Sequence, residues 1–156
     1  MKTGFHIDIY TISNNRNNEN IEKFLLKYVD RKIIQETKDF EVDILNNNTH
    51  RNIKLKSFND LIGLGLSDFK NCFTIYLSSA ILEIKSIILS FTADGKVIFG
   101  ISIDENNNYE FAEKLSVDLK SNNFGIESFF DIESIPAINM KDFLENVEIA
   151  KNKFYQ

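Results

Sequence analysis

The stretch that decides the fold runs from Ile87 to Asp104 and reads IILSFTADGKVIFGISID. Two runs rich in β-branched and aromatic residues flank Asp94-Gly95, a dipeptide suited to the positive φ angles of a two-residue type I′ turn. Both runs are apolar on both faces, as expected for strands that are covered above and below. The stretch therefore predicts a β-hairpin at the middle of a covered sheet, and it contains no catalytic or cofactor motif.

The composition is that of an ordinary globular protein. The chain has 156 residues, of which 43% are hydrophobic and 26% charged, and it is long enough to bury roughly two thirds of its unfolded surface. No apolar run approaches the roughly 20 residues of a membrane span, and the start of the chain lacks the pattern of a signal peptide. The single cysteine, Cys72, excludes an intrachain disulfide. We therefore expect one soluble, cytoplasmic domain over residues 1–156.

Hydrophobic periodicity predicts the elements on either side of the hairpin. Strands are expected around residues 5–10, 40–44, 53–55, 73–77 and 124–132, and helices starting near Asn17 or Asn18, Ser57, Asn107 and Asn139. The second and third of these strands are expected to pair across Asn46 to Arg51, and Asn107 with Glu110 has the spacing of a capping box. The order predicts an α+β fold, with a mixed, mainly antiparallel sheet and helices packed on at least one face.

The net charge of −5 is unevenly distributed. Residues 94–156 carry 12 acidic against 6 basic residues, and residues 1–93 carry 11 against 12. An acidic surface repels nucleic acid and attracts a basic partner. Direct binding to nucleic acid is therefore not expected, since no basic stripe with interleaved aromatic residues occurs. Lys27, Arg31 and Lys32 fit the C-terminal end of a helix instead.

Candidate chemical groups are few. His6 and Asp8 project from one strand face, and together with His50 they have the residue types of a metal or acid–base site, but no His-x-x-x-His or Cys-x-x-Cys spacing supports one. Cys72 lacks the surroundings of a catalytic nucleophile and is better read as a buried apolar residue. Gly63-Leu64-Gly65 lacks the third glycine of a dinucleotide site and indicates close packing or a bend. No cofactor or metal is expected.

The remaining candidate is a docking surface formed by acidic residues. Asp104 and Glu105 follow the central hairpin, and Glu127, Asp131 and Glu133 share one face of the strand that carries Phe129. An aromatic side chain ringed by carboxylates suits a basic protein, because charge speeds encounter and the aromatic ring supplies contact energy. The opposite reading of Phe129, as a core residue beneath a helix, is equally compatible with its sequence position.

The run from Ile88 to Asp104, the helix after it and the acidic strand that follows resemble small cytoplasmic immunity proteins of bacteria. The upstream segment Leu61-Ile62-Gly63-Leu64-Gly65-Leu66-Ser67 is similar to the one such proteins carry before that hairpin. These proteins neutralise polymorphic or contact-dependent growth inhibition toxins. The resemblance implies a protein that is not an enzyme and that binds a cognate toxin domain, such as a nuclease, in stoichiometric amounts.

Two other readings stay open. A small enzyme or ligand-binding domain would use the His6 and Asp8 strand face and would require a pocket with perturbed pKa values. A homodimer built on an exposed sheet edge would need no small-molecule chemistry, so the chain is expected to be either a monomer or a homodimer.

Overall fold

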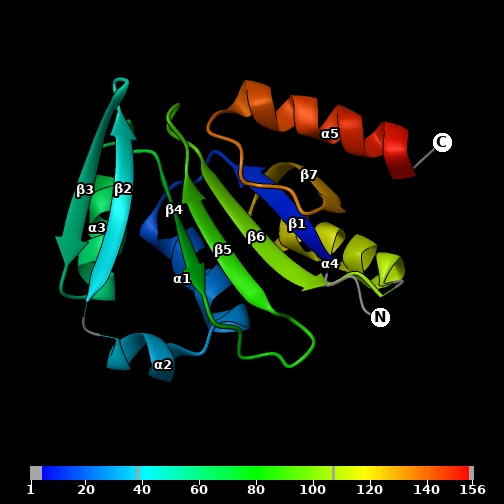
Figure 1. Ribbon diagram of the computed structural model, residues 1–156, viewed down its shortest axis with the longest axis horizontal. Coiled ribbons are helices and arrows are strands. Elements are labelled where there is room, and N and C mark those ends of the chain that lie inside the picture. The colour runs from blue at the N-terminus through cyan, green and yellow to red at the C-terminus, as the bar shows by residue number, and fades with distance from the viewer. Residues whose placement is uncertain (1–4, 38, 107, 155–156) are drawn as a thin grey trace.

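The computed structural model describes residues 5–37, 39–106 and 108–154 as a single α+β domain (Figure 1). The strands are β1 (His6–Ser13), β2 (Phe40–Asn46), β3 (Thr49–Leu55), β4 (Phe73–Leu77), β5 (Ser86–Phe91), β6 (Val97–Asp104) and β7 (Gly125–Ile132). The helices are α1 (Asn18–Tyr28), α2 (Arg31–Glu36), α3 (Phe58–Ser67), α4 (Tyr109–Asn122) and α5 (Met140–Phe154). The predicted order is confirmed, with α2 as an addition.

The main sheet has five strands in the order β4-β5-β6-β1-β7, and the separate β2–β3 hairpin forms a second, two-stranded sheet. All pairs between the described strands are antiparallel. The α+β class and the mainly antiparallel sheet are therefore confirmed. β5 and β6 occupy inner positions of the sheet, as their apolar faces require.

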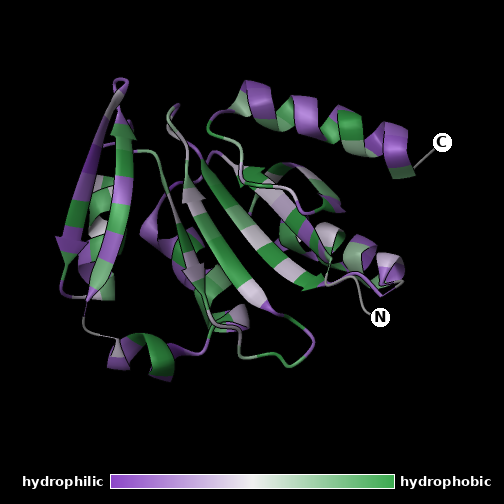
Figure 2. Cartoon of the chain, in the orientation of Figure 1, coloured by the Kyte–Doolittle hydropathy of each residue, from purple (hydrophilic) through white to green (hydrophobic). Residues whose placement is uncertain are grey.

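Both faces of the main sheet are covered by helices. One face packs Ile9, Leu89 and Phe99 against α1 and α4, together with α3 and the β2–β3 hairpin. The other face packs Tyr10 and Ile98, among others, against α5. Figure 2 shows the hydrophobic colour concentrated in β5 and β6, whereas the outer strand β3 is mostly hydrophilic. The alternation of side chains along each strand therefore divides the core into two layers.

The turn of the central hairpin differs from the predicted type I′ turn. Only Gly95 has a positive φ, of 83°. The N–H of Gly95 donates to the Thr92 carbonyl, and the N–H of Lys96 donates to the Thr92 hydroxyl at 2.8 Å. The loop is therefore one residue longer than predicted, with a left-handed glycine as its third residue. The two-residue turn with positive φ angles occurs instead in the β2–β3 hairpin, at Asn47 and Asn48.

Several helix starts follow the sequence closely. The side chain of Asn17 accepts from the N–H of Asn20 at the start of α1, and that of Ser57 accepts from the N–H of Asp60 at the start of α3. The predicted cap residue Asn107 lies outside the described residues, and α4 begins at Tyr109.

The short helix α2 corrects the interpretation of the basic residues after α1. Asp30 accepts hydrogen bonds from the N–H groups of Lys32 and Ile33, and it thereby caps a new helix. Arg31 and Lys32 therefore lie at the start of α2, and only Lys27 lies in the last turn of α1. A helix of six residues shows too little periodicity to be recognised from sequence.

The first residues of the predicted last strand also differ from expectation. Phe124 precedes β7 with a φ of 54° and is 59% exposed, so it does not share a strand face with Phe130. Ile126 packs against the core layer beneath α5, whereas Phe130 packs on the opposite side. The register between β1 and β7 shifts at Ile12 and Ser13, and this irregularity breaks the simple alternation.

A buried arginine joins three loops. Arg16 is only 3% exposed, and its guanidinium donates to the carbonyl groups of Gly65, Thr92 and Asn71 at distances of 2.7 to 2.9 Å. The ring of Phe91 lies 4.9 Å from the guanidinium carbon. Burial lowers the pKa of Arg16 to about 10. This residue connects the end of α3 to the loop of the central hairpin.

None of the described helices combines the length and the apolar character needed to cross a membrane.

Candidate functional site

Strand pairing brings residues from distant parts of the sequence to one end of the main sheet. In the pairing of β1 with β6, His6 lies opposite Asp104 and Asp8 opposite Ser102. On its other side, Asp8 lies opposite Asp131 of β7. The N–H of Glu133 donates to the carbonyl of His6, and the N–H of Glu105 donates to that of Phe5. Four of the predicted acidic residues are therefore gathered around the start of β1.

This end of the sheet contains a hollow of about 240 Å³. It is lined by strands β1, β4, β5 and β6 and by the segment after β7, through His6, Asp8, Tyr10, Tyr76, Ser86, Ile88, Ser102, Glu133, Ser134 and Ile135. The lining contains two carboxylates and no lysine or arginine. Gly100 lies opposite Tyr10, and a Cβ there would come within 2.7 Å of the Tyr10 ring. Glycine therefore lets this ring lie flat against the sheet beside the hollow.

Asp8 is the half-buried carboxylate inside the hollow. Burial raises its pKa, while hydrogen bonds from the Ser102 hydroxyl and the Ser134 backbone, together with nearby His6, act in the opposite direction. No lysine or arginine among the described residues forms an ion pair with Asp8. The site thus holds a half-buried carboxylate whose negative charge is balanced only in part.

The neighbouring polar groups fix the segment that crosses the sheet after β7. The hydroxyl of Tyr10 donates to the carbonyl of Ser134. Burial also raises the pKa of Tyr10 above its usual value, so this hydroxyl stays protonated. Glu133 adopts a left-handed φ of 48° and turns the chain over the start of β1. Within the described structure, Nδ1 of His6 is buried and has no hydrogen-bond partner.

The predicted acidic residues at this end differ in how strongly they are engaged. Asp104 forms an ion pair with Lys85 at 3.1 Å, and Asp131 forms one with Lys153 at 2.8 Å. Glu105 accepts a hydrogen bond from the Tyr109 hydroxyl. Glu133 is exposed. Glu133 is therefore the acidic residue of the predicted set that is most available to a partner.

Two predicted site residues lie elsewhere. Glu127 is opposite Ile12, towards the other end of β7, where Lys120 approaches it at 3.5 Å. Phe129 is 6% exposed and packs edge-on against Phe143 of α5. The expectation of an exposed aromatic anchor is therefore wrong for Phe129, because α5 covers this part of the sheet. The alternative reading, as a core residue beneath a helix, is correct.

The remaining candidates for catalysis do not join the hollow. His50 is exposed on β3, in the separate two-stranded sheet. Cys72 is buried, and burial raises the pKa of its thiol, which disfavours the reactive thiolate. Gly65 lies against the ring of Phe91, in agreement with a packing role. Across the described ranges, no group of three or more His, Cys, Asp or Glu residues is arranged to hold a metal ion.

Sequence reasoning missed Tyr10, Tyr76 and Ser102 as members of the site. The alternation along β1 places Tyr10 on the same face as His6 and Asp8, so this residue was detectable from its spacing. Tyr76 and Ser102 belong to β4 and β6, and only the pairing of strands places them there.

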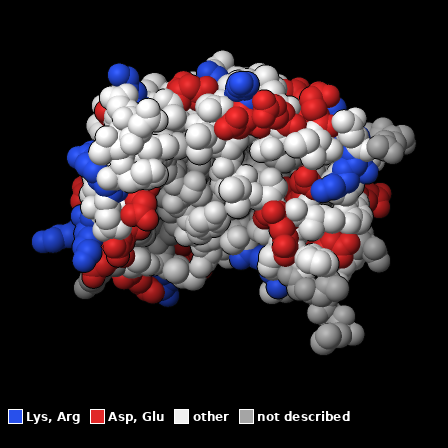
Figure 3. All heavy atoms as spheres, turned by 45° about the horizontal axis from the view of Figure 1, so that its top comes forward, with Lys and Arg blue, Asp and Glu red and all other residues white. Residues whose placement is uncertain are grey.

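The charged groups are unevenly distributed over the surface. Figure 3 shows acidic atoms at several places on the visible face, and basic atoms most clearly at its left edge, where acidic atoms lie beside them. Arg51 and Lys54 are exposed on the β2–β3 hairpin. Glu41 and Asp43 are exposed on the same hairpin, so its charges are mixed.

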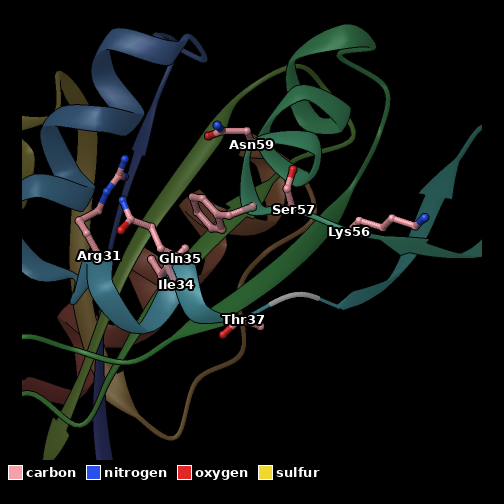
Figure 4. Close-up of a pocket in the computed structure, with 8 residues that line it drawn as sticks. Arg31, Ile34, Gln35, Thr37, Lys56, Ser57 and Asn59 are labelled. Carbon is pink, nitrogen blue, oxygen red and sulfur yellow. The ribbon is translucent and has the colours of Figure 1, made fainter.

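Another pocket, of about 280 Å³, lies between α2 and the start of α3 (Figure 4). Its basic residues do not converge, because Lys56 extends away from it and Arg31 pairs with Glu22 at 3.3 Å. The hydroxyl of Ser57 already caps α3. This pocket therefore offers no preformed group for catalysis.

Comparisons of the chain with protein-family models, with curated proteins and with solved structures found no match. The carboxylates gathered around the start of β1 are therefore the basis for a functional proposal.

Proposed function

We propose that this chain is a toxin-neutralising immunity protein that acts in the cytoplasm and binds a basic toxin domain in stoichiometric amounts. The observation that carries the proposal is the register of β1, which places Asp8 beside Asp131 and His6 beside Asp104 at one end of the sheet. Glu105 and Glu133 join them through backbone hydrogen bonds. We call Asp8, Asp104, Glu105, Asp131 and Glu133 the acidic end.

A surface of this kind suits inhibition by binding. Clustered carboxylates speed the encounter with a basic protein and disfavour partners of the same charge. Many toxic nucleases bind nucleic acid through basic surfaces. A protein that covers such a surface competes with the substrate, and it needs no catalytic group of its own. Specificity then depends on which charged and apolar groups of the toxin match the inhibitor.

The proposal is tested with the tagged chain expressed in its source organism. A basic toxin domain that co-purifies in a one-to-one ratio is then produced alone, and its toxicity is measured with and without the chain. We expect protection from toxicity and a complex that weakens as salt rises. If no stoichiometric partner is recovered, or if the recovered domain stays toxic beside the chain, the proposal is wrong.

A pair of charge reversals locates the interface. Glu133→Lys alters the acidic end, and Glu127→Lys makes the same charge change towards the opposite end of β7. We expect Glu133→Lys to weaken the complex by about tenfold or more and Glu127→Lys to change it by less than about threefold. If the two variants weaken the complex equally, the acidic end is not part of the interface.

A second candidate function is a small enzyme or ligand-binding domain on the same strand face. It is favoured by one observation, the hollow that contains Asp8 with a raised pKa and His6 with an unpaired Nδ1. Mass spectrometry of the purified chain under native conditions tests it. A small molecule bound in stoichiometric amount would favour this candidate over the immunity function.

A further inference from the structure

We infer that the hollow around Asp8 receives a cationic side chain of the protein partner, the guanidinium of an arginine or the ammonium of a lysine. The inference rests on the proposed function and assigns a specific pocket to it. Asp8 supplies the carboxylate inside the hollow and Glu133 a second one at its edge. The lining holds no lysine or arginine that would compete with the incoming cation, and its one imidazole, that of His6, forms no ion pair with Asp8 within the described structure.

The size of the hollow favours a side chain over a metabolite. Its volume of about 240 Å³ is below the roughly 300–1,000 Å³ typical of pockets for whole small molecules. It is large enough for the planar end of one arginine or the end of one lysine. Tyr76 is 62% exposed and lines the same hollow, so its ring is available to stack on a guanidinium.

The hydrogen bonds inside the hollow leave acceptors for the N–H groups of a cation. Asp8 already accepts from Ser102 and from the backbone of Ser134, but an ionised carboxylate has about four acceptor positions. The hydroxyl oxygens of Ser86 and Ser102 lie in the same lining. A guanidinium brings five donors in a fixed fork, which matches a carboxylate flanked by hydroxyl groups.

Asp8 lacks the ion pair that two of the neighbouring carboxylates have. Asp104 pairs with Lys85 and Asp131 pairs with Lys153. Asp8, which is more deeply placed than the exposed Glu133, has no such pair within the described structure. A half-buried carboxylate without a cationic partner is unfavourable, and a cation from outside removes the imbalance. Asp8 is therefore the half-buried carboxylate inside the hollow whose negative charge a cation of the partner can balance.

The test compares Asp8→Asn with Asp60→Asn. Both substitutions remove one negative charge and preserve the shape of the side chain, but Asp60 is exposed in the first turn of α3 and lines none of the acidic end. With the toxin domain that co-purifies, we expect Asp8→Asn to raise the Kd by about tenfold or more and Asp60→Asn to change it by less than about twofold. An unchanged Kd for Asp8→Asn overturns the inference and leaves the proposed function intact.

A second measurement uses the free chain and needs no partner. Butylguanidinium, and its neutral analogue butylurea, are titrated at millimolar concentration while backbone amide signals are followed by NMR. We expect butylguanidinium to shift the signals of Tyr76, Ser86 and Ser102 in the wild type, with no such shift in Asp8→Asn or with butylurea. Equal shifts with the two compounds, or none with either, overturn the cationic pocket. The proposed function fails in a different experiment: no stoichiometric partner is then recovered when the tagged chain is purified.

Discussion

The carboxylate of Asp94 accepts a hydrogen bond from the backbone N–H of Met140, with an oxygen-to-nitrogen distance of 3.0 Å. Its other oxygen accepts from the Thr92 hydroxyl at 2.7 Å. The loop of the central hairpin therefore caps the first turn of α5, the helix that covers the second core layer. This contact links the stretch that decides the fold to the element that buries Phe129.

Replacement of Asp94 by alanine is expected to lower the free energy of unfolding by about 1 kcal/mol, the usual value for loss of a helix cap. Urea unfolding followed by circular dichroism measures the change. Glu145→Ala, on the exposed side of α5, is the control and is expected to stay within about 0.5 kcal/mol of the wild type. Equal stability of Asp94→Ala and the control would show that this contact does not hold α5.

The contribution of Asp94 is expected to depend on pH. Partial burial alone would raise its pKa, but the hydrogen bonds from Met140 and Thr92 and the charge of Lys96 outweigh it and hold the pKa below the usual value. A carboxylate whose pKa is lowered by folding stabilises the folded state above its unfolded pKa of about 3.9 and loses this effect as pH falls through the folded pKa. The stability difference between wild type and Asp94→Ala is therefore expected to be constant near neutral pH and to shrink below about pH 4. A difference that grows on acidification would contradict this assignment.

Asp8→Asn is expected to raise the free energy of unfolding at pH 7 by about 0.5–1 kcal/mol, as substitutions at functional positions sometimes do. Burial raises the pKa of Asp8 in the folded state, so its ionised form costs stability at pH values above that raised pKa. The cost disappears as pH falls below the unfolded pKa, where both states are protonated. Urea unfolding at several pH values checks this. A clear loss of stability in Asp8→Asn would instead give Asp8 a structural role.

Arg16→Lys is expected to lower the free energy of unfolding by about 2–3 kcal/mol. A lysine keeps the charge but cannot reach the carbonyl groups of Gly65, Thr92 and Asn71 together, and buried acceptors are left unpaired. Arg51→Lys, on the exposed face of β3, is the matched control and is expected to change stability by less than about 0.5 kcal/mol. Similar values for the two variants would mean that the contacts of Arg16 add little.

Asp131→Ala is expected to increase self-association through the outer edge of β7. One oxygen of Asp131 accepts from the N–H of Ile132 at 2.7 Å and from Lys153 at 2.8 Å. The N–H groups of an edge strand are sites for pairing with another chain, and charged side chains placed over them prevent it. Sedimentation velocity measures the association, with Asp142→Ala as the control. Loss of oligomers in Asp131→Ala, relative to the wild type, would show the reverse: that Asp131 supports a homodimer.

Much of the fold could be predicted from residues close together in the sequence. The apolar spacing of α1 with its cap Asn17, the cap Ser57 before α3 and the two apolar runs around Gly95 each express a preference that acts over a few residues. The short helix α2 was missed because Asp30 starts it within a stretch that carries hardly two turns. The predicted turn type at Asp94 is wrong. The Asp94 carboxylate accepts a hydrogen bond from the backbone N–H of Met140, a residue of another element, and such a contact cannot be read from the turn sequence.

The sequence by itself determined the α+β class, the order of the longer elements and the acidic character of the C-terminal part. Only the tertiary structure decided that Phe129 is buried and that Asp8 lies among the predicted acidic residues. The physical reason is the range of the interactions. Helix caps and alternation act between neighbours, whereas the surroundings of Asp8 are set by the pairing of β1 with β6 and β7, whose residues are distant along the chain.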